Sequence, residues 1–244
     1  MATVQDDGST PWERTSHALG RLFNRPIDVL EAGGGSASYL SYPSGSHCTV
    51  VDNSPEQVEA NTYADEVILA DLETFDFGSE RFDVVVFYNV LEHLADPLTV
   101  VAHAIEGLRQ GGAIVIAGPK VSSLTGLVTK FSPHWFHVFI YKRIFRHPTA
   151  GQPGSPPFPA YLRWSVNPPA LSAFLRRNDL SLIHCEEFAS TQIGLLRARS
   201  AFLHGSYLLA AKTLGAVTLG RLGGTSTDFQ LLAVKGKQVA RDGR

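Results

Sequence analysis

A glycine-rich stretch that follows an acidic residue is the first part of this sequence that could do chemistry. It runs Glu31-Ala32-Gly33-Gly34-Gly35-Ser36, and its glycines suit a sharp turn whose backbone approaches a ligand closely. Roughly twenty residues later, Asp52 ends a β-branched run, the position from which a carboxylate holds ribose hydroxyls in nucleotide-binding sheets. Together these residues predict a site for an adenosine-containing ligand. For the glycines alone, an ordinary tight turn is the alternative.

The spacing of the glycines argues against a dinucleotide ligand. A dinucleotide fingerprint has the form G-x-G-x-x-G, but counting from Gly33 gives Gly35 and then Ser38, so the third glycine is absent. Glu31, directly before the loop, would repel a pyrophosphate and suits a positively charged amino-acid portion better. The sequence therefore favours a cationic cofactor, with a nicotinamide reductase as a distant alternative.

Alternating strand and helix patterns must position these residues. Up to residue 118 the patterns predict strands over 27–32, 47–51, 66–69, 82–88 and 113–117, with helices over 56–64 and 98–108. Such alternation demands right-handed crossovers and a parallel sheet, and ligands bind such sheets at the carboxyl ends of the strands. We therefore expect an α/β fold whose glycine turn and Asp52 lie at one edge.

The C-terminal half departs from this alternation. It predicts a helix from Pro168-Pro169 through Arg177 and strands over 180–188 and 229–234. Between them lie an aromatic, proline-rich insertion over 120–165 and a second insertion over 195–222 whose apolar residues recur at helical spacing. We expect a single domain over 1–244, in which the two insertions form a substrate lid.

A set of motifs resembles the class I S-adenosylmethionine-dependent methyltransferases. Val29-Leu30-Glu31-Ala32-Gly33-Gly34-Gly35-Ser36 is similar to their first motif. The later matches are Asp52, Ala70-Asp71-Leu72, Phe82-Asp83, Asn89-Val90-Leu91-Glu92-His93-Leu94 and Leu108-Arg109-Gln110-Gly111-Gly112. Ala37 departs from the pattern, because the family usually has glycine there. The resemblance implies a Rossmann-like, mostly parallel seven-stranded sheet with its last strand antiparallel, flanked by helices. It also implies methyl transfer from S-adenosylmethionine.

The resemblance further implies which residues hold the cofactor. They are Glu31 and the backbone of Gly33, Gly34 and Gly35 for the methionine portion, Asp52 for the ribose hydroxyls, Asn53 for the adenine edge, Asp71 with Leu72 for the adenine ring, and Asn89 beside the sulfonium.

His93 is the candidate catalytic residue. Orienting an acceptor in line with the activated methyl group can supply about 7–11 kcal/mol of the barrier, so a base is needed only for a weakly nucleophilic acceptor. Imidazole titrates near neutral pH, although a histidine that packs on the sheet is an equal alternative. The Glu92-His93 pair also resembles quinone-biosynthesis methyltransferases, whose metal site uses a glutamate three positions before Glu92. That position is Asn89 here, so we predict no metal.

The first insertion supplies candidate substrate-binding residues. His134, His137 and Tyr141 would contact the acceptor if the aromatic stretch covers it. In the alternative, the aromatic residues pack the insertion onto the sheet; they are Phe131, Trp135, Phe136 and Phe139. The basic cluster, defined as Lys142, Arg143 and Arg146, is either a solvated face or a contact for acidic substrates or lipid headgroups.

Composition limits the partners. The formal charge of -2 gives no net positive field for nucleic acid. Cys48 and Cys185 lie in separate apolar runs without metal spacing, which favours reduced thiols, and residues 1–11 lack a signal-peptide pattern. Charged residues interrupt the second insertion, so we expect no membrane span. We expect a cytoplasmic protein with a small-molecule substrate, with homodimerisation or peripheral membrane contact as further roles of that insertion.

Three functions are compatible with these residues. The first is O- or N-methylation of a small molecule in a bacterial biosynthetic pathway. The second is an enzyme such as a cyclase that uses the same cofactor and releases methylthioadenosine instead of S-adenosylhomocysteine. The third is a noncatalytic module that retains the cofactor pocket. A glycine turn and Asp52 are shared by all three, so these residues predict cofactor binding in each case.

Overall fold

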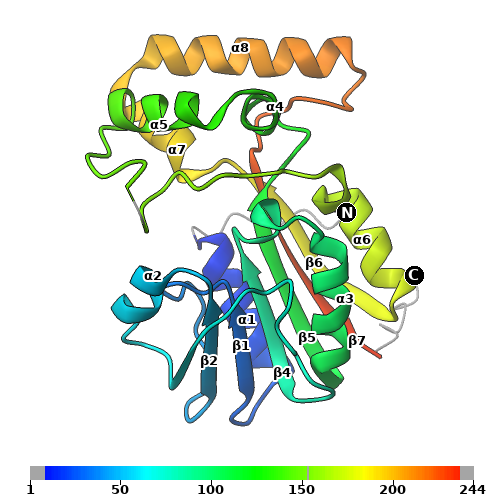
Figure 1. Cartoon of the computed structure of the whole chain (residues 1–244). Helices are drawn as coiled ribbons and strands as arrows, with labels where there is room; N and C mark the ends of the chain where they lie inside the picture. Colours follow the sequence, from blue (N-terminus) through cyan, green and yellow to red (C-terminus); the bar gives the residue numbers. More distant parts are fainter. Residues whose placement is uncertain (1–8, 153, 237–244) are drawn as a thin grey trace.

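A mixed seven-stranded sheet forms the centre of the molecule in the computed structural model, which describes residues 9–152 and 154–236 (Figure 1). The strand order is β3-β2-β1-β4-β5-β7-β6. Only β7 runs antiparallel to its neighbours, because it pairs antiparallel with both β5 and β6. The strands are β1 Asp28–Ala32, β2 His47–Asp52, β3 Glu66–Leu69, β4 Phe82–Tyr88, β5 Leu108–Pro119, β6 Leu180–Phe188 and β7 Asp228–Lys235.

Helices cover both faces of the sheet and one of its edges. They are α1 Pro11–Leu22, α2 Pro55–Ala60, α3 Pro97–Gly107, α4 Leu124–Phe131, α5 His134–Arg143, α6 Pro168–Arg177, α7 Thr191–Arg199 and α8 Ala201–Val217, with short 3-10 turns η1 Leu91–His93 and η2 Trp164–Val166. On one face α1 packs against the central strands, and on the other face α3 and α6 do so (Figure 1). The insertion helices α4, α5, α7 and α8 gather beyond the carboxyl ends of the strands.

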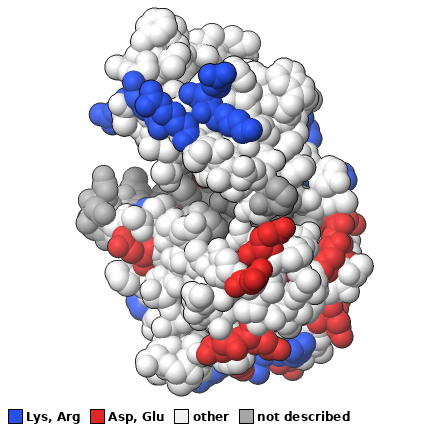
Figure 2. Space-filling model, turned by 60° about the vertical axis from the view of Figure 1, so that its left-hand side comes forward, with Lys and Arg blue, Asp and Glu red and all other residues white. Residues whose placement is uncertain are grey.

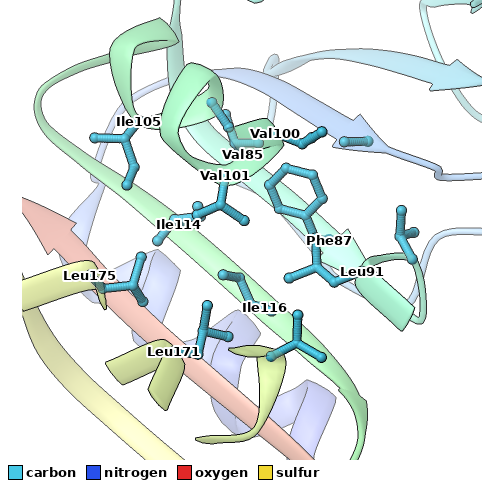
Figure 3. Packing of buried hydrophobic residues seen from close by; sticks show 14 of the residues in the cluster. Val85, Phe87, Leu91, Val100, Val101, Ile105, Ile114, Ile116, Leu171 and Leu175 are labelled. Carbon is cyan, nitrogen blue, oxygen red and sulfur yellow. The ribbon is translucent and has the colours of Figure 1, made fainter. Parts of the chain in front are cut away.

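The larger core lies between the sheet and the pair α3 and α6 (Figure 3). Strands β4 and β5 contribute Val85, Phe87, Ile114 and Ile116, which are all nearly inaccessible to solvent. Both strands are buried on their two faces, which explains their nearly continuous apolar sequences. Each buried side chain of this size stabilises the fold by about 1.5–3 kcal/mol, so this core fixes the position of the strand ends.

The structure confirms the predicted fold class and corrects several boundaries. The helix predicted over 56–64 ends at Ala60, and the strand predicted over 113–117 extends over 108–119. The single helical pattern predicted over 195–222 consists of two helices, because Ser200 is extended and caps α8. Cys48 and Cys185 are both free thiols, as predicted, although Cys185 is only half-buried.

Candidate active site

The predicted cofactor residues lie together because parallel strands bring their carboxyl ends to one edge. Glu31 is nearly at the end of β1, where its side chain is buried. Its carboxylate accepts hydrogen bonds from the hydroxyls of Ser38 (2.5 Å), Tyr42 (2.6 Å) and Tyr63 (2.7 Å). Burial and the adjacent Glu31 charge raise the pKa of both tyrosines, so both remain donors. A carboxylate offers about four acceptor sites, so one is left for a ligand.

The glycine turn is joined to Asp52 at the end of β2. The amide of Gly35 donates to Asp52 Oδ2 at 3.0 Å, and the amide of Ser54 donates to Oδ1 at 2.9 Å. Each carboxylate oxygen retains a second lone pair, and Asp52 is only half-buried. A Cβ at Gly33 would lie 2.4 Å from Val90, and its φ of +70° also favours glycine. The backbone cradle and the half-buried carboxylate fit the amino-acid and ribose portions of S-adenosylmethionine.

The remaining predicted cofactor residues follow β2, β3 and β4. Asn53 and Asp71 are exposed, and the amide of Ala70 donates to the carbonyl of Asp52, which holds Asp71 beside that strand end. Leu72 is buried in the core. Asn89 has a left-handed φ of 52°, and its amide donates to Ala117, so β4 ends there and the chain turns across β5. Their contacts with a cofactor stay predictions.

Glu92 and His93 lie in η1, just beyond the end of β4. Burial raises the pKa of Glu92 to about 8, and no other residue in the described part of the chain donates to its carboxylate. His93 Nδ1 lies 2.6 Å from the carbonyl of Pro159, which can only accept, so Nδ1 carries the proton. Burial lowers the pKa of His93, and its unprotonated Nε2 lies 3.8 Å from Glu92 Oε1. The pair therefore offers an imidazole lone pair beside a buried carboxyl.

Two further groups at this edge were not found by sequence reasoning. Asp228 begins β7 opposite Pro119, and burial raises its pKa to about 7, with nearby Glu92 adding to the effect. Tyr88 ends β4, and its ring lies 4.4 Å from the rings of both Trp12 and Tyr39. Trp12 belongs to α1 and Tyr39 to the loop after β1, so only the tertiary fold brings them together. In the sequence, the only indication of Asp228 as a site residue is its position directly before the apolar run of the last strand.

The proline-rich end of the first insertion crosses the predicted cofactor site. Gln57 Nε2 of α2 donates to the carbonyl of Gly154 at 2.9 Å, next to the glycine turn. Further along, Pro159 contacts His93, and the amides of Tyr161 and Leu162 donate to the carbonyl of Glu92 at 2.8 and 3.1 Å. The segment 154–162 thus runs from the end of β2 to the end of β4, and we call it the lid segment.

The three predicted substrate residues on α5 divide into two groups. Tyr141 lies near Gln192 of α7 and within electrostatic reach of Asp228, so it faces the carboxyl edge. The rings of His134 and His137 stack on each other at 6.5 Å, and His137 Nε2 lies 3.0 Å from Ser132 Oγ. The structure therefore connects only Tyr141 with the edge, and the substrate contacts of all three residues stay predictions.

The alternative in which the aromatic residues pack the insertion onto the sheet is wrong for most of them. Phe131, Trp135 and Phe139 are exposed, and only Phe136 is half-buried. No helix within the described residues is long and apolar enough to cross a membrane. Over 9–152 and 154–236, no three histidine, cysteine or acidic side chains are grouped so that they could hold a metal.

Two surface hollows lie away from this edge. One, of about 290 Å³, is lined by residues 73–78 with His103 and Glu106, and the other, of about 380 Å³, lies between α1 and residues 41–43. Neither contains a predicted site residue. The predicted site residues lie instead at the strand ends near the lid segment.

The fold defines the class, a Rossmann-like sheet with an antiparallel β7, and the residues predicted to hold an adenosine-type cofactor lie at its carboxyl edge. The sequence model of a family described as "Methyltransferase domain" matches residues 7–184. The chain belongs to this family and is an S-adenosylmethionine-dependent methyltransferase. No curated protein matches the chain significantly.

Solved structures with the same fold share little sequence with this chain. The [4+2]-cyclase SpnF is 13% identical with a TM-score of 0.56, and the alignment covers 95% of this chain and 84% of SpnF. The cyclopropane synthase MmaA2 from Mycobacterium tuberculosis is 18% identical with a TM-score of 0.53, over 95% and 87%. The plantazolicin methyltransferase BpumL is 17% identical with a TM-score of 0.52, over 95% and 87%. At such identities the likeness shows the fold alone.

Proposed function

We propose that this enzyme methylates an oxygen or nitrogen atom of a small molecule in a biosynthetic pathway, with the acceptor bound between η1, β7 and the lid segment. The single observation that carries the proposal is the Glu92-His93 pair at the end of β4, where a buried carboxyl faces an unprotonated imidazole nitrogen. BpumL, the plantazolicin methyltransferase of the same fold, was solved in complex with a monoazolic desmethylPZN analog and SAH, and a compound of that kind is the acceptor class we propose here.

The chain's own residues would bind and orient the two reactants. When bound, S-adenosylmethionine supplies a methyl group that its sulfonium already activates. Glu31, the glycine turn and Asp52 would hold the cofactor, and Asn89 would lie beside the sulfonium. Asn89 and Glu92 both extend over the end of β5, because a Cβ at Gly118 would lie 3.9 Å from Asn89 Oδ1 and 3.3 Å from Glu92 Oε2. This neighbourhood supports a position of Glu92 and His93 next to the reacting centre.

Nε2 of His93 would take a proton from the methyl acceptor, while the Nδ1–H of the same ring donates to the carbonyl of Pro159. Glu92 would stabilise the imidazolium that forms, because a positive sulfonium nearby favours the ionised form of its carboxyl. For a hydroxyl acceptor, general-base catalysis of this kind contributes roughly 10²- to 10⁴-fold in rate. An amine that reacts in its neutral form would depend on His93 less.

Calorimetric titration with S-adenosylmethionine tests the cofactor site. We expect saturable binding that Asp52→Asn weakens roughly tenfold to a hundredfold, because one charge-assisted hydrogen bond to the ribose is lost. Asp179→Asn is the matched control, since Asp179 lies before β6 at the opposite edge of the sheet. Equal weakening in both variants, or stronger binding of NAD than of S-adenosylmethionine, would contradict the site.

Product analysis tests the reaction and the role of His93. With panels of phenols, alcohols and amines we expect S-adenosylhomocysteine and a methylated acceptor, and a kcat that falls at least tenfold in His93→Ala for hydroxyl acceptors. Release of methylthioadenosine would identify the cyclase-type alternative. Cofactor binding without any turnover would support the noncatalytic module. An unchanged kcat and pH profile in His93→Ala would remove the proton-accepting role.

A further inference from the structure

The two insertions carry positive charge only. Residues 120–165 contain six Lys or Arg and residues 195–222 contain four, and neither stretch contains an Asp or Glu. All 23 acidic residues therefore lie elsewhere, and the formal charge is +10 on the insertions against -12 on the remainder. On the face shown in Figure 2, the upper part carries blue side chains and no red ones, while the lower part carries both red and blue side chains.

Helix α5 combines this charge with exposed aromatic rings. Trp135 and Phe139 have exposed fractions of 68% and 51%, and they are four residues apart, so they lie on one side of the helix. Lys142 and Arg143 continue that side in the next turn, and Arg146 follows. All three basic side chains are exposed, and none forms an ion pair with a described residue.

Helix α8 is mostly apolar and yet hardly buried. Its 17 residues include one charged residue, Lys212, and only Ala211 is buried. The outward side presents Phe202, Leu209 and Val217, whose exposed fractions are 81%, 69% and 77%. A helix that is hydrophobic all round is normally buried in a core or in lipid. The contacts among the described residues do not explain the composition of α8.

The two helices form one platform beyond the carboxyl edge of the sheet. Arg199, at the end of α7, donates to the carbonyls of Ile144 and Phe145 at 2.6 and 3.1 Å, so it joins the end of α5 to the α7-α8 pair. Figure 1 shows both helices beyond the carboxyl ends of the strands, with α8 farther from the sheet than α5. Both helices therefore present exposed side chains at the same end of the molecule.

We propose that the outer face of α5 and α8 docks on the surface of an anionic lipid bilayer. Aromatic and long apolar side chains enter the boundary between headgroups and acyl chains, and Lys and Arg beside them attract anionic headgroups. The platform has no acidic residue to oppose this attraction. Because no described helix can span a membrane, the platform would lie on the bilayer.

Other partners fit these observations less well. An acidic protein or a nucleic acid would match the charge but would leave the apolar side chains of α8 in water. A second copy of the chain would bring two strongly positive platforms together, and their repulsion would oppose such a dimer. Of these partners, only the anionic bilayer would both attract the basic side chains and remove the apolar side chains from water.

Flotation with lipid vesicles tests the proposal independently of any methyl transfer. We expect the full chain to bind vesicles of equal parts phosphatidylcholine and phosphatidylglycerol, and to bind phosphatidylcholine vesicles at least about tenfold more weakly. Lys142→Ala/Arg143→Ala/Arg146→Ala and, separately, Trp135→Ser/Phe139→Ser/Phe202→Ser should each weaken the anionic-vesicle binding about tenfold or more. The exposed matched control is Arg21→Ala/Arg176→Ala/Arg177→Ala, on α1 and α6, and it should bind like the unaltered chain.

Trp135 provides a second readout. On anionic vesicles we expect a blue shift of tryptophan emission that Trp135→Phe loses, and unchanged S-adenosylmethionine affinity in solution would show that each variant is folded. The proposal is overturned if the chain does not bind anionic vesicles, or if the platform variants bind as well as the control. It is also overturned if RNA binds more tightly than the vesicles, or if the platform variants abolish a dimer in sedimentation experiments without vesicles.

Discussion

Two buried glutamates at the carboxyl edge of the sheet, Glu31 and Glu92, differ in their hydrogen-bond partners and are therefore suited to different roles. Three hydroxyls donate hydrogen bonds to the carboxylate of Glu31 beneath the glycine turn. Glu92 is as deeply buried but receives no hydrogen bond from another described residue, and burial raises its pKa to about 8. Glu31 is therefore suited to hold a cationic cofactor. Glu92 is suited to lose its proton when such a cofactor binds.

Proton release on cofactor binding is the first consequence of the Glu92 environment. A sulfonium placed beside Glu92 would lower its pKa, so binding near pH 7 should release a fraction of a proton. Calorimetry in buffers of different ionisation enthalpy measures this release. Glu92→Gln should reduce it, whereas Glu106→Gln, at an exposed position on α3, should leave it unchanged. Equal release in both variants would show that Glu92 stays neutral when the cofactor binds.

The same environment makes the stability of the cofactor-free chain depend on pH. The folded pKa of Glu92 is raised to about 8, while the unfolded value is about 4.3, so the folded state binds more protons between these values. The contribution of Glu92 is therefore fully present below about pH 4 and is lost as the pH rises to about 8. In urea denaturation over this range, Glu92→Gln should lose stability less steeply than the unaltered chain. A parallel decline would rule out a large shift at Glu92.

At the scale of elements, the ends of β1 and β4 depend on each other. Gly33 turns the chain out of β1, and its amide donates to Val51 while its Cα faces Val90 after β4. The left-handed φ at Asn89 similarly turns the chain out of β4 toward η1. The site is thus built from two neighbouring turns that pack on each other, and a change in one should disturb the other.

Gly33→Ala should therefore destabilise the fold and weaken cofactor binding. The added Cβ would lie 2.4 Å from Val90 at a positive φ, and overpacking of this kind costs about 1–3 kcal/mol of unfolding free energy. Adding Val90→Ala should restore part of the loss by removing the clash. Gly20→Ala on α1, where a Cβ meets nothing within 4 Å, should be neutral or stabilising by up to about 1 kcal/mol. Thermal unfolding compares all three, and an unaltered midpoint for Gly33→Ala would contradict the packing argument.

At the scale of the whole molecule, the insertions cap the edge where the cofactor site lies. The lid segment is tied to α2 and η1 by hydrogen bonds, while α5 and α8 present the charged and apolar platform on the far side. Residues 120–165 and 195–222 thus lie beyond the carboxyl ends of the strands, and their role as a substrate lid stays a prediction. We propose that cofactor binding and closure of the lid segment are coupled.

Hydrogen exchange tests this coupling. The amides of Tyr161 and Leu162 donate to the carbonyl of Glu92, so a cofactor that orders η1 should slow their exchange. Saturating S-adenosylmethionine should protect peptides covering 154–162, and Gln57→Ala should reduce the protection by removing the tie at Gly154. The amino-edge turn around Asp179 serves as an internal reference. Unchanged exchange over 154–162 would contradict the coupling.

The sequence by itself determined the fold class and predicted where the cofactor would bind. Apolar runs, the glycine turn and Asp52 are local patterns, and parallel strands necessarily bring their carboxyl ends to one edge, so the edge follows without coordinates. The sequence predicted the ends of the helices less well. The cap at Ser200 and the early end of α2 depend on competition between helical and extended backbone at a few residues.

Tertiary structure alone decided which distant groups share the site and which face water. Burial raised the pKa of Glu92 and Asp228, and burial is set by packing among elements far apart in the chain. The contact of Pro159 with His93 joins residues 66 positions apart, and it assigns the imidazole proton. The aromatic residues of α5 have a sequence that suits either a core or a surface. Only the folded chain shows that Trp135 and Phe139 are exposed, because exposure depends on what lies beside a helix as well as on its own composition.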